Sequence, residues 1–159
     1  MDDLDQFLKE HPNVKVKESF GATVPGAVPV YIPREYPPNY TPFEEEEQAD
    51  YVAWLTIVRP DIRFFSVPNG GRRSKREGAM LQRTGVKAGV PDLVFPFACG
   101  PYHHLYQETK RIKGGKVEAS QAIWHDYLRI QGCCVDVCFG AEGLKKSLLA
   151  YLALGPFKT

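Results

Sequence analysis

The stretch from Gly89 to Lys110 reads GVPDLVFPFACGPYHHLYQETK and contains two short apolar runs, Leu93–Phe95 and Leu105–Tyr106. Proline, cysteine and glycine residues separate the two runs, and the segment Cys99–Pro101 is typical of a turn. We therefore predict that the two runs pair as antiparallel strands joined by a hairpin-like connection.

Each apolar run carries a carboxylate at one end. Asp92 precedes the first run, whereas Glu108 follows the second and stands two residues before Lys110. Antiparallel pairing brings the start of one strand beside the end of the other, so we expect Asp92 and Glu108 to lie together. Two carboxylates and an amine at one strand edge cost stability unless something offsets them, and a divalent cation does so. The pattern predicts a metal-dependent hydrolytic site.

Oxygen atoms of this stretch suit Mg²⁺ or Mn²⁺. The carboxylates of Asp92 and Glu108 are hard ligands, and the backbone carbonyl of Thr109 is a further candidate. Lys110 shares a strand face with Glu108, where it can orient a metal-bound water or neutralise charge in the transition state. The alternative is a surface ion pair between Glu108 and Lys110, because the pattern P-D…E-x-K is weak by itself.

The net charge of +1 conceals a segregation of charge along a chain of 159 residues. Four consecutive acids occupy Glu44–Glu47, six bases against one acid lie between Arg72 and Lys87, and four bases lie between Lys110 and Lys116. Positive segments beside a carboxylate cluster are what a metal site acting on a polyanion requires. The hydrophobic content of 43% indicates one globular domain.

Several features exclude other classes of protein. No apolar run is long enough to span a membrane, and the first residues lack the apolar segment of a signal peptide. The four cysteines (Cys99, Cys133, Cys134, Cys138) lack the spacing of a zinc site or a disulfide framework. We expect reduced, mostly buried thiols and a cytoplasmic protein of a bacterial or phage-infected cell.

Residues 1–42 hold seven of the thirteen prolines and show no sustained period. We interpret them as an N-terminal arm that packs on the core or on a partner, and a mobile tail is the alternative. Thr41 and Pro42 then predict the start of a helix that runs to about Val58, with Thr41 as its N-cap. Its apolar stripe faces the same way as Glu44 and Glu47, and either of these two acids can reach the metal site.

The remaining pattern predicts alternating strands and helices. The expected elements are a strand over 62–67, a helix over 75–84 capped by Ser74, the hairpin, a helix over 121–131 capped by Ser120, a strand over 133–139 and a helix over 142–154. In the helix over 121–131 the apolar positions are Ile123, Trp124, Tyr127, Leu128 and Ile130. The fold class is therefore α/β, with a small mixed sheet flanked by helices.

Four motifs together resemble the VRR-NUC (virus-type replication–repair nuclease) family, a branch of the PD-(D/E)XK restriction-endonuclease-like superfamily. They are PNGGRRSKR over 68–76, GVKAGVPDL over 85–93, QETKRIKGGK over 107–116 and SQAIW over 120–124. The resemblance spans about two thirds of the chain, from Phe43 to Leu152, and defines a nuclease domain over 43–159. Gln107 departs from the family pattern, which has an aliphatic residue before Glu108, and the arm has no counterpart.

The resemblance implies a restriction-endonuclease-like core and a metal-dependent phosphodiesterase. Asp92, Glu108 and Lys110 would be its central residues, an acid of the first helix (Glu44 or Glu47) would join them, and Gln121 would face the site from the following helix. Basic and amide side chains would contact nucleic acid, or form ordinary solvated loops: Asn69, Arg72, Arg73, Lys75, Arg111 and Lys113.

The first hypothesis is a metal-dependent DNA endonuclease that is structure-selective, similar to Holliday-junction resolvases or acting on replication and repair intermediates. The resemblance implies a homodimer across branched DNA. A catalytically silent nucleic-acid-binding or scaffold module with the same fold is the alternative. An enzyme acting on a small phosphate ester is less favoured, because the two basic segments are too extended for a small ligand.

Overall fold

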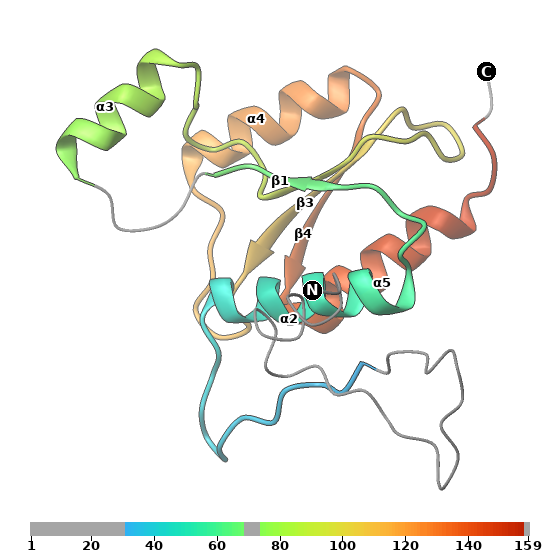
Figure 1. Cartoon of the computed structure of the whole chain (residues 1–159). Helices are drawn as coiled ribbons and strands as arrows, with labels where there is room; N and C mark the ends of the chain where they lie inside the picture. Colours follow the sequence, from blue (N-terminus) through green and yellow to red (C-terminus); the bar gives the residue numbers. More distant parts are fainter. Residues whose placement is uncertain (1–30, 69–73, 158–159) are drawn as a thin grey trace, which may run out of the picture.

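The computed structural model describes residues 31–68 and 74–157 of the chain (Figure 1). Its helices and strands are, in chain order, α2 (Glu44–Val58), β1 (Phe65–Ser66), α3 (Lys75–Arg83), β2 (Leu93–Phe95), β3 (Leu105–Lys110), α4 (Ala119–Ile130), β4 (Cys134–Phe139) and α5 (Gly140–Ala153). The strands form one sheet in the order β1-β2-β3-β4. The α/β class with a small mixed sheet flanked by helices is thus confirmed.

The predicted hairpin is the centre of this sheet. β2 and β3 pair antiparallel, with Leu93 opposite Gln107 and Phe95 opposite Leu105. All three residues of β2 are buried, which fits its uninterrupted apolar run. β1 pairs antiparallel with β2 over only two residues, so the strand expected over 62–67 is shorter than predicted. β3 and β4 pair in parallel, and α4 connects them as a crossover helix.

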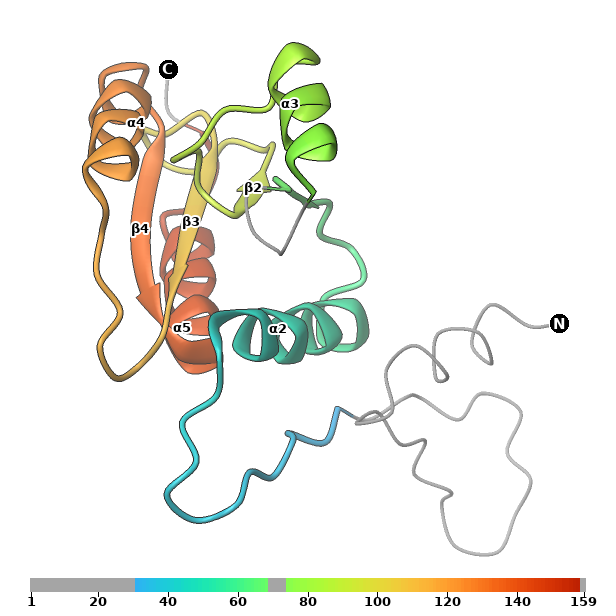
Figure 2. The same cartoon turned by 90° about the vertical axis from the view of Figure 1, so that its left-hand side faces the viewer.

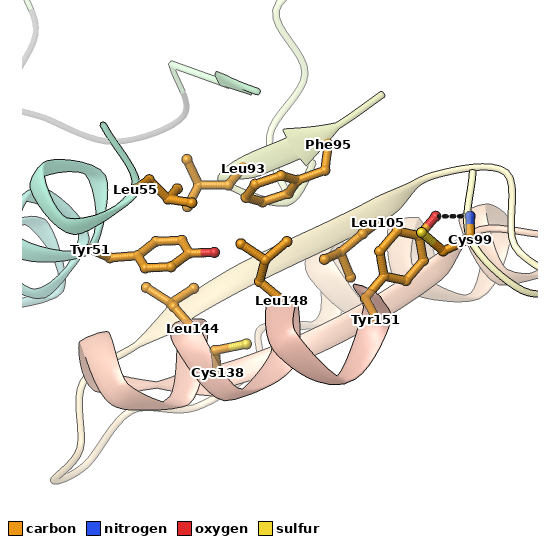
Figure 3. Close-up of a cluster of buried hydrophobic side chains, with 10 residues drawn as sticks. All are labelled: Tyr51, Leu55, Leu93, Phe95, Cys99, Leu105, Cys138, Leu144, Leu148 and Tyr151. Atoms are coloured by element: carbon orange, nitrogen blue, oxygen red, sulfur yellow. Dashed lines mark hydrogen bonds between the residues drawn. The ribbon is translucent and has the colours of Figure 1, made fainter. Parts of the chain in front are cut away.

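Helices cover both faces of the sheet. α4 lies on the side of β3 and β4 opposite to α5, as the two perpendicular views in Figures 1 and 2 show. α2 and α5 pack together beneath the other face. The main core joins α2, β2 and α5 there, and Tyr51, Phe95, Leu144 and Leu148 converge at its centre (Figure 3). A smaller core around Leu128 lies under α4.

At the N-termini of α2 and α4, the hydrogen bond that caps the helix comes from a side chain of the helix's own first turn. The predicted hydroxyl caps are not used. α2 begins after Phe43, whose N–H donates to Glu46 Oε2 at 2.8 Å, so the prediction of Thr41 as N-cap is wrong. α4 begins after Glu118, whose N–H donates to Gln121 Oε1 at 2.8 Å, so the prediction of Ser120 is also wrong. In both helices a long side chain at the third position reaches back to the free N–H. Ser74 does cap α3, since it accepts from the N–H of Glu77.

The orientation of α4 differs from the one that its apolar residues suggest. Ile123, Tyr127 and Ile130 are 71%, 54% and 80% exposed. The helix instead contacts the sheet through Leu128, half-buried Trp124 and a histidine, His125, that is only 3% exposed. A polar side chain thus takes the place of an aliphatic one in the interior.

The described part of the arm packs against α2. Tyr36 Oη donates to Asp50 Oδ2 at 2.9 Å, and Tyr40 Oη donates to Glu46 Oε2 at 2.7 Å. The ring of Tyr31 lies against the ammonium group of Lys145 on α5. Side chains of residues 31–42 therefore contact α2 and α5, whereas residues 1–30 fall outside the described part of the chain.

Two further expectations concern the cysteines and the membrane. All four cysteines are free, and Cys99, Cys133 and Cys138 are buried, as predicted. In the part of the chain that the structure covers, none of the helices has the length and apolar character that crossing a membrane requires.

Candidate active site

The hairpin brings Asp92 and Glu108 to the same end of the sheet. Leu93 pairs with Gln107, so the next position along the ladder sets Asp92 opposite Glu108. The carboxylate Oδ2 of Asp92 accepts from the N–H of Thr109 at 2.8 Å, and the carbonyl of Asp92 accepts from the N–H of Val67. Asp92 is thereby fixed by both neighbouring strands. The structure places these two predicted site residues together.

Glu108 is the most confined member of the cluster. Its side chain is 1% exposed, and Oε1 accepts from Lys110 Nζ at 2.7 Å. Gln121 Nε2 donates to the same oxygen from the first turn of α4. Since Gln121 also caps α4 through Oε1, the start of that helix is tied to the end of β3. Lys110 is buried as well, which excludes the alternative of a surface ion pair.

Burial opposes the ionisation of both carboxyl groups. Desolvation raises the pKa of Glu108 to about 7, and the nearby charges of Asp92 and Glu44 add to this, although Lys110 acts in the opposite direction. Desolvation also raises the pKa of Asp92, against the N–H of Thr109 and the charge of Lys110. Such shifts are typical of functional carboxylates and are relieved by a bound cation.

The two candidate acids of α2 occupy different places. Glu44 raises the pKa of both Asp92 and Glu108 by its charge, and its Oε1 accepts from the N–H of Arg111 at 3.1 Å. Glu47 is buried and accepts from the N–H of Ala141 at 2.7 Å, in the first turn of α5. Glu44 therefore faces the cluster, whereas Glu47 stabilises the start of another helix.

The backbone of Thr109 is a candidate ligand because of the residue opposite it. Extending the register of β2 and β3 by two positions sets Pro91 opposite Thr109. Proline has no N–H, so Pro91 supplies no ladder hydrogen bond to the carbonyl of Thr109. The carbonyl of Thr109 thus lacks the ladder donor that another residue opposite it would supply, at the position where the two carboxylates meet.

His125 is a site residue that the sequence interpretation missed. It lies one helical turn after Gln121, and its Nε2 is 3.7 Å from Glu108 Oε2. Neither of these two atoms has a hydrogen-bond partner among the described residues, although both are buried. Desolvation lowers the pKa of His125, and the charges of Arg129 and Lys110 act in the same direction, which favours the neutral imidazole. The spacing Gln121-x-x-x-His125, which places both side chains on one helix face, was the available signal.

Comparison with known proteins identifies a structural relative. No family model matches the chain, and no curated protein matches it. A solved structure described as a VRR_NUC domain protein is 27% identical, with a TM-score of 0.64 over 75% of this chain and 95% of that chain. The chain has a VRR-NUC-like fold. The fold that the sequence motifs implied is thereby confirmed, and it is a nuclease-like fold.

The residues expected to contact nucleic acid are distributed unevenly on this VRR-NUC-like fold. Asn69, Arg72 and Arg73 lie outside the described residues, as does the side chain of Lys75. Arg111 donates to the carbonyls of Thr41 and Pro42, which commits two of its nitrogens to the arm. Lys113 is exposed and lines a pocket of about 790 Å³ beside the carboxylates.

The donor set of the cluster fits a divalent cation in its chemistry. Asp92 and Glu108 supply carboxylates, and Glu108 Oε2 is buried without a hydrogen bond. The carbonyl of Thr109 is a third candidate oxygen. Within residues 31–68 and 74–157, no three acidic, histidine or cysteine side chains stand close enough to hold an ion by themselves. A bound ion therefore requires the backbone oxygen, water or substrate oxygens to complete its shell, as Mg²⁺ commonly does.

Proposed function

We propose that this protein is a metal-dependent endonuclease that hydrolyses phosphodiester bonds of DNA. The observation that supports the proposal is the buried pair Asp92 and Glu108, held by Lys110 and Gln121 at one end of the sheet of a nuclease-like fold. A pair of carboxylates that resists ionisation without a cation is costly as a purely structural feature.

The residues that would hold Mg²⁺ or Mn²⁺ are Asp92, Glu108 and the carbonyl of Thr109, with Glu44 as the helix acid. When bound, the cation would lower the pKa of a water molecule and offset the negative charge of the phosphate. Glu108 Oε1 accepts from two donors, whereas Glu108 Oε2 has no hydrogen bond and would be the oxygen left for a cation.

Lys110 and Gln121 keep the reacting groups in place. The ammonium group of Lys110 donates to Glu108 at 2.7 Å and adds a positive charge where the transition state gains negative charge. Gln121 restrains the same carboxylate from α4, and its amide is itself restrained by the N–H of Glu118. Gln121 is thus oriented by two contacts, which reduces the cost of organising the site during the reaction.

The substrate that we propose is DNA, and we further propose selectivity for branched structures and a homodimer that presents two sites. Exposed bases on the described surface support a polyanionic substrate, among them Arg76 and Arg83 on α3 and Lys113 and Lys116 after β3. The exposed apolar stripe of α4 (Ile123, Tyr127, Ile130) is a candidate face for association.

The test uses purified protein with linear duplex, single-stranded, flap and four-way-junction DNA, each with Mg²⁺, Mn²⁺ or EDTA. We expect cleavage that EDTA abolishes and that Asp92→Ala and Lys110→Ala reduce by at least about 100-fold, the range for groups that stabilise a transition state. Thermal unfolding of each variant checks that it folds.

Each outcome decides a separate part of the proposal. Binding of DNA without metal-dependent cleavage would leave the silent binding module as the better interpretation. Equal cleavage of all four DNA structures would exclude structure selectivity. Full activity of Asp92→Ala would mean that the metal binds elsewhere, and a monomer in analytical ultracentrifugation with and without DNA would exclude the homodimer.

A further inference from the structure

Phe43 is an exposed aromatic residue in a fixed position beside the candidate active site. It immediately precedes α2, and 56% of its surface is exposed. The guanidinium group of Arg111 lies over its ring, with 4.6 Å between Arg111 Cζ and the ring centroid. That guanidinium is itself held by the carbonyls of Thr41, at 2.6 Å, and Pro42, at 3.2 Å. One face of the ring is therefore supported, and the remaining exposed area is available to a ligand.

The ring of Phe43 lines a pocket that reaches the residues around the carboxylate cluster. The pocket has a volume of about 790 Å³, and Glu44, Lys110 and Gln121 line it together with Phe43. This size is within the range of pockets that bind an organic ligand. The pocket thus connects an aromatic surface directly to the groups that hold Glu108.

The charges around the pocket suit a polynucleotide strand. Lys113 and Lys116 are exposed on the loop after β3 and line the pocket. In the described portion of the protein no carboxylate forms an ion pair with either of them, so both are available for phosphate groups. Glu45 and Glu118 also line the pocket and would repel a phosphate, which restricts the backbone to the lysine side.

We propose that Phe43 stacks against an unpaired nucleobase of the DNA strand that the carboxylate cluster cleaves. The inference rests on the proposed function and specifies its substrate as DNA with a single-stranded segment at the cleavage site. Bases inside a duplex have both faces covered by their neighbours, whereas an unpaired base offers a free face to an aromatic ring. A single ring with one supported face stacks with one base, and Lys113 and Lys116 hold the adjoining phosphates.

The test is a binding measurement in EDTA, so that it does not depend on cleavage. A short single strand with 2-aminopurine and the matched duplex are titrated with wild-type protein, Phe43→Leu and Phe43→Trp. For the wild type we expect quenching of 2-aminopurine fluorescence in the single strand. Phe43→Leu should weaken single-strand binding by about 5- to 100-fold, the range for loss of one stacked base. Phe43→Trp should remain close to the wild type, and circular dichroism checks that each variant folds.

A matched control is Phe157→Leu. Phe157 is also exposed, but it lies against the ring of His103, which precedes β3 at the end opposite to Glu108 and Lys110. This variant should bind both DNAs as the wild type does. An equal loss of single-strand and duplex binding in Phe43→Leu, no loss in that variant, or no binding by the wild type would overturn the proposal.

The outcome separates this proposal from the nuclease proposal. Selective loss of single-strand binding in Phe43→Leu, without cleavage by the wild type in Mg²⁺ or Mn²⁺, would support stacking and contradict the nuclease. Cleavage by the wild type with Phe43→Leu unaffected in binding would support the nuclease and contradict stacking.

Discussion

Glu108 combines three contacts that act on one carboxylate. Lys110 and Gln121 donate to Oε1, and His125 faces Oε2 at 3.7 Å. This distance is longer than a hydrogen bond, so the imidazole contacts the carboxylate without bonding to it. The two oxygens of Glu108 therefore have different environments: Oε1 accepts from two donors, whereas Oε2 is buried without a hydrogen bond.

The first prediction concerns His125 as a positioning residue for Glu108. His125→Leu should lower the affinity for Mn²⁺ by about 10-fold or more, because a group that orients a metal ligand typically contributes that much. His125→Gln keeps an N–H donor and should restore part of the affinity. Isothermal titration calorimetry at constant pH measures both. Wild-type Mn²⁺ affinity in His125→Leu would mean that the histidine only fills space.

Helix α2 carries two inward-facing acids, Glu44 and Glu47, and each of them contacts a different element of the fold. Glu44 accepts from Arg111 beside the carboxylate cluster, whereas Glu47 accepts from the N–H of Ala141 at the start of α5. Glu44 and Glu47 are three positions apart, so they share one face of the helix. Their side chains nevertheless reach different elements.

The second prediction separates these tasks with two isosteric variants. Glu44→Gln should lower the affinity for Mn²⁺ by about 10-fold and leave the free energy of unfolding nearly unchanged, because a charged ligand is lost at a partly exposed position. Glu47→Gln should lower the free energy of unfolding by about 1 kcal/mol and retain the metal affinity, since a charged helix cap is lost. Urea unfolding and calorimetry provide the two measurements. The reverse result would place Glu47 at the metal.

The turn before β2 and the start of α4 approach each other at Gly89. A Cβ atom there would lie 2.5 Å from the carbonyl oxygen of Ser120, and φ is +89°. Gly89 therefore permits the close approach that brings Gln121 to Glu108.

The third prediction uses a second glycine with a similar backbone as its control. Gly85 has φ of +102°, and a Cβ atom there would meet no other atom within 4 Å, so Gly85→Ala introduces backbone strain alone. Gly89→Ala should lose about 1–3 kcal/mol more than Gly85→Ala and should also lose cleavage activity, because α4 must move. Urea unfolding and the cleavage assay compare the two variants. Equal losses in both would show that contact with Ser120 is unimportant.

The stability of the whole molecule depends on pH through the buried carboxyl group. The pKa of Glu108 is about 7 in the folded protein and has an ordinary value of 4.5 in the unfolded chain. Between these values the folded state binds more protons than the unfolded state, so stability falls as pH rises through this window. The destabilisation of the folded state by this carboxylate is absent below pH 4.5 and complete above about pH 7.

The fourth prediction is that the free energy of unfolding in EDTA falls by about 3 kcal/mol between pH 4.5 and 7 through this group, as its pKa difference implies. Mg²⁺ or Mn²⁺ should raise the unfolding midpoint more at pH 8 than at pH 5, because the ionised carboxylates bind the cation. Glu108→Gln should flatten the decline, although it leaves Lys110 without its partner. Urea unfolding at several pH values measures the slope, and a wild-type slope in Glu108→Gln would assign the dependence to another group.

Much of the fold and part of the site followed from local patterns. The two apolar runs and the turn between them predicted the hairpin, and antiparallel pairing predicted that Asp92 and Glu108 meet. Ser74 predicted the start of α3, because a hydroxyl cap acts within one helical turn. The motifs around these residues implied the VRR-NUC-like fold, which the structural relative confirms.

The sequence by itself thus determined that the two strands of the hairpin pair and which carboxylates they bring together, since strand period, turns and pairing direction are properties of neighbouring residues. Only the tertiary structure decided which acid of α2 faces the site, which side of α4 is buried and that His125 approaches Glu108. These features depend on how helices distant in the chain are placed against the sheet. Glu44 and Arg111 are 67 residues apart, and no local pattern specifies that contact.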